Sequence, residues 1–127
     1  MKKLLLDTSV LIDFLRRKDK ERSLLIKVNH LGYSPAISFI THTELFSGKS
    51  IWQKKKAKRE LEALLSGLEI ILLNLQLSQR AGKIRARYQI GLIDAIIAAC
   101  AIEEKLSLVT LNVKDFKKIK GLKVFKI

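Results

Sequence analysis

Short runs of consecutive apolar residues alternate along the chain with longer segments in which apolar residues recur every three or four positions. The short runs are typical of strands that are buried on both faces, as in a parallel sheet. They predict five strands, at Leu4–Leu6, Ala36–Phe39, Ile70–Leu73, Leu108–Leu111 and Val124–Ile127.

The spacing of apolar residues in the longer segments predicts helices between these strands. The clearest helix covers roughly Trp52–Leu68, where leucines share one face and lysines and glutamates take most other positions. Further helices are expected after Asp7 and around Leu24–Leu31, Leu77–Tyr88 and Ile93–Lys105. Strands that alternate with helices imply right-handed crossovers and a parallel sheet covered on both faces, so the predicted fold class is α/β.

The length of 127 residues fits one domain, residues 1–127, with a core of ordinary size. No apolar stretch reaches the roughly 18 residues of a membrane span, and the N-terminus has no signal-peptide pattern. The single cysteine, Cys100, is expected to be a small buried residue and has no partner for an internal disulfide. These features favour a cytoplasmic protein with no membrane association.

The formal net charge is +13, with an isoelectric point near 10.1. A field of this sign attracts polyanions, and nucleic acid is the commonest polyanion in a cytoplasm. A lysine-rich surface of the kind found in proteins from hot environments would give the same charge. Charge alone therefore leaves both interpretations open.

Two basic segments are candidates for contact with RNA. Arg80, Lys83 and Arg87 lie at i, i+3 and i+7, on one face of a predicted helix, where either an RNA-binding stripe or an ordinary solvated face would fit. The segment KKKAKR at residues 54–59 follows Trp52. We expect Trp52 to pack in the core or in a subunit interface, although an exposed indole could stack on a base.

The acidic residues are few, 12 in all, and several fall where a strand or loop passes into a helix. Asp7 directly follows the first predicted strand, and Glu44 follows the second by a few residues. Asp94 opens a predicted helix, whereas Asn112 and Asp115 follow the fourth strand.

Each acid has a purely structural interpretation. Asp7 could cap its helix, and Asp94 in a first turn would be favoured by the helix dipole. Thr41 and Glu44 have the T-x-x-E spacing of a capping box. Asp13, about two turns beyond Asp7, is expected to be structural only.

Together the acids favour a functional interpretation, because ligands of parallel α/β sheets bind at the edge where the strands end. Carboxylates brought together there repel one another unless a cation lies among them, and hard oxygen ligands select Mg²⁺ or Mn²⁺. A basic protein with an acidic pocket fits the metal-dependent cleavage of a phosphodiester.

Four segments carry a resemblance to a known family: LLDTSVLIDFL, SFITHTELFSG, LIDAIIAACAIEEKLSLVTLNVKDF and IKGLKVFKI. Their order and separations span nearly the whole chain. The sequence resembles the PIN-domain ribonucleases and, within them, the VapC-type toxins of prokaryotic toxin–antitoxin pairs.

The resemblance implies a three-layer α/β/α sandwich with a central parallel sheet, and an endoribonuclease that depends on Mg²⁺ or Mn²⁺. Asp7, Glu44 and Asp94 match the family's first three acidic positions and are the expected catalytic and metal-binding residues. Asn112 occupies the fourth position, where many members have aspartate, and Asp115 is a further candidate that would act through water. Thr8, Ser9 and Thr110 match hydroxyl positions that orient the carboxylates.

The implied mechanism is in-line attack on phosphorus by a metal-activated water, which leaves a 5′-phosphate and a 3′-hydroxyl. The implied partners are RNA as substrate, a second copy of the chain in a homodimer, and a small antitoxin protein. Housekeeping RNA processing by the same chemistry is an alternative.

Other classes of protein fit less well. A haloacid-dehalogenase-like domain requires a second aspartate two positions after the first, where this chain has Ser9. A receiver domain requires an acidic pair before its first helix, which is absent. A non-catalytic RNA-binding module with a degenerate PIN site is disfavoured by Asp7, Glu44 and Asp94, and only Asn112 favours it.

Overall fold

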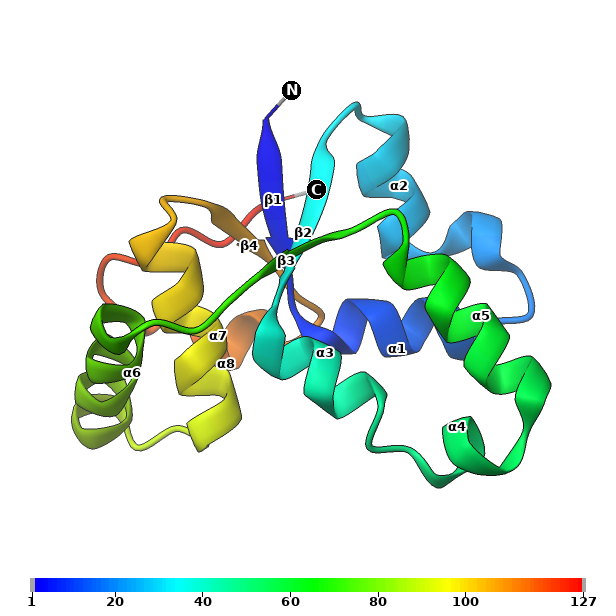
Figure 1. Cartoon of the computed structure of the whole chain (residues 1–127). Coiled ribbons are helices and arrows are strands. Elements are labelled where there is room, and N and C mark those ends of the chain that lie inside the picture. Colours follow the sequence, from blue (N-terminus) through cyan, green and yellow to red (C-terminus); the bar gives the residue numbers. More distant parts are fainter. Residues whose placement is uncertain (1, 127) are drawn as a thin grey trace.

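The centre of the molecule is a sheet of four parallel strands in the order β3-β2-β1-β4 (Figure 1). The structure, a computed structural model, describes residues 2–126. The strands are β1 (Lys3–Leu6), β2 (Ser34–Ser38), β3 (Glu69–Ile71) and β4 (Ser107–Val109). In the register of the central strands, Leu5 of β1 lies between Ala36 and Leu108.

Helices cover both faces of the sheet, which confirms the predicted α/β/α sandwich. Because side chains alternate along a strand, Leu5 packs into one core, while Leu4 and Leu6 pack into the other. The Leu5 core is completed by α6 (Leu75–Tyr88), α7 (Leu92–Glu103) and α8 (Val113–Phe116). The opposite core is completed by α1 (Thr8–Arg16), α2 (Leu24–His30) and α5 (Lys55–Leu65).

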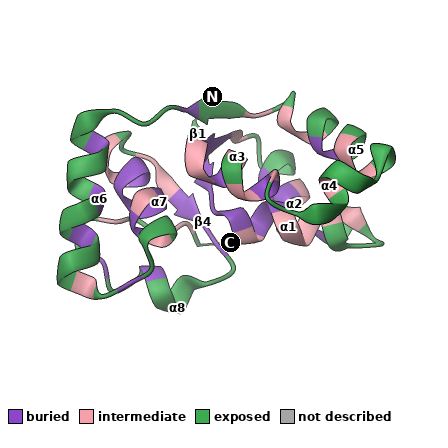
Figure 2. Cartoon of the chain, turned by 60° about the horizontal axis from the view of Figure 1, so that its bottom comes forward, coloured by how far each residue is buried: buried purple, intermediate pink, exposed green. Residues whose placement is uncertain are grey.

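The remaining helices are α3 (Phe39–Leu45), α4 (Lys49–Gln53) and the short 3₁₀ helix η1 (Lys20–Arg22). The helix α3 begins where β2 ends and contacts both α1 and α7, as Figure 2 also shows. It therefore bridges the two halves of the molecule at the edge where the strands end. Within residues 2–126, no helix combines the length and the apolar character needed to cross a bilayer.

The segment predicted as one helix over Trp52–Leu68 forms two. Lys54 adopts an extended conformation, with φ −122° and ψ 115°, and separates α4 from α5. The helix also ends at Leu65, before Leu68. No proline or glycine lies near this break, so local sequence gives no signal for it.

Within residues 2–126, the predicted fifth strand is reduced to a single parallel bridge, from Val124 to Leu108. Hydrogen bonds of 2.8 Å from Leu108 N to Lys123 O and from Phe125 N to Leu108 O support this bridge. Ile127, the last residue of this prediction, lies outside the described residues.

Candidate active site

The first candidate residue, Asp7, lies at the end of the central strand β1 and is almost fully buried, with 3% of its surface exposed. Its backbone N–H donates to Val109 O of the neighbouring strand at 2.9 Å. Asp7 occupies the cap position of α1, but its side chain makes no capping hydrogen bond. Capping therefore does not explain this buried carboxylate.

Two hydroxyl groups fix the Asp7 carboxylate. Ser9 Oγ and Thr110 Oγ1 each donate to Asp7 Oδ2 at 2.7 Å. The same hydroxyls accept from backbone N–H groups of the segment after β4: Ser9 Oγ from Leu111 and Thr110 Oγ1 from Asn112. Both side-chain donors go to Oδ2, which leaves Oδ1 without a donor from the described part of the chain.

Glu44 lies on α3, which is capped by Ser38, whose Oγ accepts from Ile40 N at 3.3 Å. Thr41 is therefore an interior helical residue, and the interpretation of Thr41 and Glu44 as a capping box is wrong. Thr8 Oγ1 lies 2.6 Å from Glu44 Oε1 and 3.0 Å from Thr41 Oγ1. Since a hydroxyl has one proton, Thr8 donates to the carboxylate and Thr41 supplies the proton of the second bond.

Asp94 is half-buried in the first turn of α7, where the helix dipole favours a negative charge. Its pKa is nevertheless raised, first by burial and then by the negative charges of Asp7, Asp115 and Glu44. The packing of the helices gives the geometry: α3, which carries Glu44, contacts both α1, which Asp7 precedes, and α7, which carries Asp94. These three acids, far apart in the sequence, therefore lie on elements that meet where the strands end.

Asn112 precedes the short helix α8, Asp115 lies within that helix, and both residues are exposed. Asn112 takes the cap position without a side-chain capping bond. Asp115 lies close enough to affect the pKa of Asp94, which places it at the margin of the same acidic region.

The donor set is suited to a hard divalent cation, because it consists of carboxylate oxygens whose mutual repulsion disfavours ionisation of Asp94. A cation would relieve that repulsion. Among residues 2–126, no three acidic, histidine or cysteine side chains are drawn together closely enough to form a ready-made metal centre. The carboxylates therefore define an acidic region rather than a preformed metal centre.

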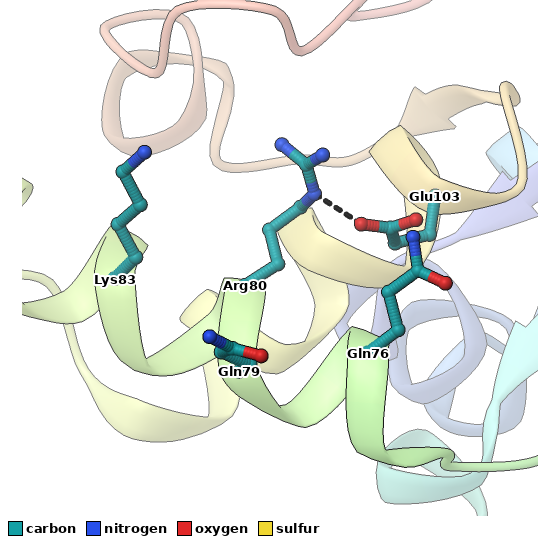
Figure 3. A pocket seen from close by; sticks show the side chains of 5 residues that line it. All are labelled: Gln76, Gln79, Arg80, Lys83 and Glu103. Atoms are coloured by element: carbon teal, nitrogen blue, oxygen red, sulfur yellow. Dashed lines mark hydrogen bonds and ion pairs between the residues drawn. The ribbon is translucent and has the colours of Figure 1, made fainter.

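The basic stripe predicted on α6 lies apart from this region. Arg80 forms an ion pair with Glu103 at the far end of α7, and the two residues line a pocket together with Lys83 (Figure 3). Glu103 is nine residues beyond Asp94, or about 13 Å along the helix. Arg87 lines a neighbouring pocket with Lys83 and Lys120.

Trp52 does not lie where the sequence analysis expected it, and Thr41 has a role in the site that the sequence analysis did not predict. Trp52 is 65% exposed, which excludes a place in the core, and its Nε1 donates to Phe46 O at 2.7 Å. Thr41, through its bond to Thr8, belongs to the hydroxyl network around Glu44. A buried threonine three residues before an acid is too common a pattern to identify such a role.

Comparison with known proteins agrees with the architecture. The model of the PIN domain family matches residues 4–122. The ribonuclease VapC10 of Mycobacterium tuberculosis is 34% identical over 125 residues, which cover 94% of this chain and 90% of that relative.

Solved structures of toxin–antitoxin complexes contain chains with a similar fold. A VapBC complex bound to DNA from Salmonella typhimurium contains a chain with a TM-score of 0.84 and 27% identity, with 98% of each chain covered. A toxin–antitoxin complex from Klebsiella pneumoniae contains one with a TM-score of 0.76 and 31% identity, covering 98% of this chain and all of that one. The chain therefore belongs to the PIN-domain family, in its VapC-type branch.

Proposed function

We propose that this protein is an endoribonuclease that requires Mg²⁺ or Mn²⁺, and that it is the toxin of a VapBC-type pair. The observation that carries the proposal is the 2.6 Å hydrogen bond from Thr8, which directly follows Asp7, to Glu44 on α3. The helix α3 also contacts α7, whose first turn contains Asp94. The relatives of this protein include VapC10 of M. tuberculosis, which is a ribonuclease.

Asp7, Glu44 and Asp94 would hold the ion, with Asp115 or Asn112 at its margin. A bound Mg²⁺ or Mn²⁺ supplies activation of a water molecule and stabilisation of negative charge on the scissile phosphate. The protein contributes rigidity: Ser9 and Thr110 hold Asp7 Oδ2, and Thr8 holds Glu44 Oε1. Asp7 and Glu44 thereby each have one carboxylate oxygen held by the protein, and the other oxygen would bind the ion.

RNA is the proposed substrate, because a net charge of +13 attracts a polyanion to a site that is itself acidic. The proposed partner protein is a small antitoxin, since the structural neighbours from S. typhimurium and K. pneumoniae are toxin–antitoxin complexes.

A homodimer is part of the proposal. Four large apolar residues at and after the edge strand β3 are exposed, among them Leu72 at 73% and Leu75 at 89%. Residues 70–79 carry no charged side chain. Because the rest of the chain is strongly basic, this uncharged segment is where two copies could meet with the least repulsion.

The alternative of a non-catalytic RNA-binding module rests on Asn112, which supplies no carboxylate at the fourth position. Incubation of the purified protein with RNA in Mn²⁺, Mg²⁺ or EDTA separates the two functions. The nuclease is expected to cut in either metal, to leave 5′-phosphate and 3′-hydroxyl ends, and to be inactive in EDTA. Binding without cleavage in all three conditions would favour the binding module and contradict the proposal.

A housekeeping role in RNA processing would use the same chemistry without an antitoxin. Expression in a bacterial host distinguishes the two roles. A toxin is expected to arrest growth, whereas Asp7→Asn is expected to be harmless. Normal growth with active, soluble protein would favour the housekeeping role.

A further inference from the structure

A pocket of about 250 Å³ lies between α1, α3, α4 and α5, and Glu44 forms part of its wall. The proposed active site and this pocket therefore share a residue. Pockets of roughly 300–1,000 Å³ hold drug-sized ligands, so a cavity of this size suits a smaller group.

The lining combines apolar walls with a few polar groups. Ile12, Leu15, Ile51 and Ala57 supply apolar surface, while Arg16, Ser50 and Glu60 add hydrogen-bonding groups. A planar heterocycle with polar edges matches this combination, because its faces need apolar contacts and its edges need donors and acceptors.

The charge of the adjacent surface indicates what kind of molecule carries that heterocycle. Residues 49–59 form α4 and the start of α5 and include six basic residues and no acidic one. All six basic side chains are exposed or partly exposed: Lys49, Lys54, Lys55, Lys56, Lys58 and Arg59. A phosphate backbone is the complementary partner.

The wall that α4 contributes is held in place. Trp52 Nε1 donates to Phe46 O, and Lys58 Nζ lies 5.1 Å from the centroid of the indole ring. Trp52 directly follows Ile51, which lines the pocket, and it is the only tryptophan in the chain. Its fluorescence is therefore a built-in reporter for events at this wall.

We propose that the pocket receives one unpaired nucleobase of the RNA, next to the phosphate held near Glu44. This inference rests on the proposed function and deepens it, because it assigns base selection to residues outside the acidic region. Single-stranded segments, whose bases are free to turn outward, are the RNA that such a pocket can accept.

The test of this proposal is to fill the pocket with a larger side chain. Ala57→Leu places extra side-chain volume inside it and keeps a residue that favours helix. Ser50→Leu fills it from α4, in case the first variant does not fold. Ala86→Leu is the matched control, since Ala86 lines a different pocket of about 300 Å³ on α6. Thermal melting verifies that each variant is folded.

Binding is followed through Trp52 fluorescence in EDTA, so that the RNA remains intact. The ligand is a short RNA that the wild-type protein cuts in Mn²⁺, together with versions that carry one abasic residue near the cut. For the wild type, one abasic position is expected to weaken binding about tenfold. The Ala57→Leu variant is expected to bind intact RNA about tenfold more weakly than the wild type does, and to bind intact and abasic RNA equally. The Ala86→Leu control is expected to behave like the wild type.

The outcomes separate this inference from the proposed function. The base pocket is contradicted if the wild type cuts RNA and both pocket-filling variants still bind intact RNA as tightly, and still prefer it to abasic RNA as strongly, as the wild type does. In that case the cavity would instead accept a side chain of a protein partner. If the wild type cuts no RNA in Mn²⁺, the proposed function fails and the base pocket fails with it.

Discussion

Thr8 illustrates how one hydroxyl group can organise the site. It donates to Glu44 Oε1 at 2.6 Å and accepts from Thr41. A hydrogen bond to a charged group contributes about 1.5–3 kcal/mol, so its loss should allow Glu44 to leave its position.

We therefore expect Thr8→Val to lower kcat/KM for RNA cleavage by about tenfold and to raise the Mn²⁺ concentration needed for half-maximal rate. Thr8→Ser retains the hydroxyl and should restore most of the activity. Equal metal dependence in the two variants would contradict a role for the hydroxyl in holding Glu44.

Whereas Thr8 stabilises the charge of Glu44, the fold without a metal ion disfavours the negative charge of Asp94. Its pKa is raised above the ordinary value of 3.8 by burial and by neighbouring carboxylates, so its contribution to stability is greatest below that pH. This contribution is lost as the pH rises through the raised pKa.

In EDTA at neutral pH, Asp94→Asn is expected to raise Tm by a few degrees, and the gain should shrink as the pH falls toward 3.8. Added Mg²⁺ should stabilise the wild type more than the variant, because the ion relieves the repulsion that the substitution removes. Melting curves in EDTA and in Mg²⁺ measure both effects. A lower Tm for the variant in EDTA would contradict this assignment.

Sequence reasoning identified Asp7, Glu44 and Asp94 because each follows or begins a recognisable element. The local pattern did not reveal the hydrogen bonds from hydroxyl groups that hold Asp7 and Glu44. Thr110, for example, is 103 residues from Asp7 yet donates to it. The T-x-x-E spacing was misleading, because Ser38 occupies the cap of α3 and leaves Thr41 to bond with Thr8.

At the scale of elements, α7 positions Asp94 by packing closely into the core. Four of its alanines are fully buried: Ala95, Ala98, Ala99 and Ala101. Cys100 is buried beside them, as expected, and burial raises the pKa of its thiol to about 12.

Ala98→Leu should overfill this contact and destabilise the fold by about 1–3 kcal/mol. The midpoint of urea unfolding measures the loss. Ala86→Leu is the control, because Ala86 lies on the exposed side of α6 and the same substitution there overfills no core. It should leave the midpoint of urea unfolding almost unchanged. If both variants have the wild-type midpoint, α7 is not closely packed.

The elements that the sequence predicted well are those with strong periodicity and enough length. Apolar spacing did not predict α3, and the capping-box interpretation placed a helix start at Thr41, too late in the chain. The seven residues of α3 follow β2 without a loop, and the apolar pair Phe39 and Ile40 continues the pattern of the strand. The break at Lys54 was not predicted, because no proline or glycine beside it signals the end of a helix. Among the described residues of the final segment, Val124 alone forms a bridge to the sheet, so an apolar run by itself did not establish a fifth strand.

At the scale of the whole molecule, a chain with a net charge of +13 contains a small group of carboxylates at the ends of its strands. RNA should therefore be attracted mainly through its backbone, and its affinity should fall with salt as counterions return to the phosphates. We expect the affinity in EDTA to fall about tenfold or more between 50 and 200 mM salt.

The two basic surfaces can be compared in the same experiment. Replacing Lys54, Lys55 and Lys56 by glutamine should weaken binding and reduce the slope with salt, because these residues lie beside the pocket that contains Glu44. Replacing Lys83 and Arg87 on α6 tests the other surface. A larger effect on α6 would contradict the path of RNA proposed here.

The central claim is that the carboxylates at the strand ends bind a divalent ion that is needed to cut RNA. The most direct test is to measure Mn²⁺ binding and RNA cleavage by the wild type and by Asp7→Asn, which keeps the size and shape of the side chain. The wild type is expected to bind Mn²⁺ and cut RNA, and the folded variant is expected to lose Mn²⁺ affinity and at least about 100-fold in cleavage rate. Undiminished cleavage by Asp7→Asn would contradict the central claim.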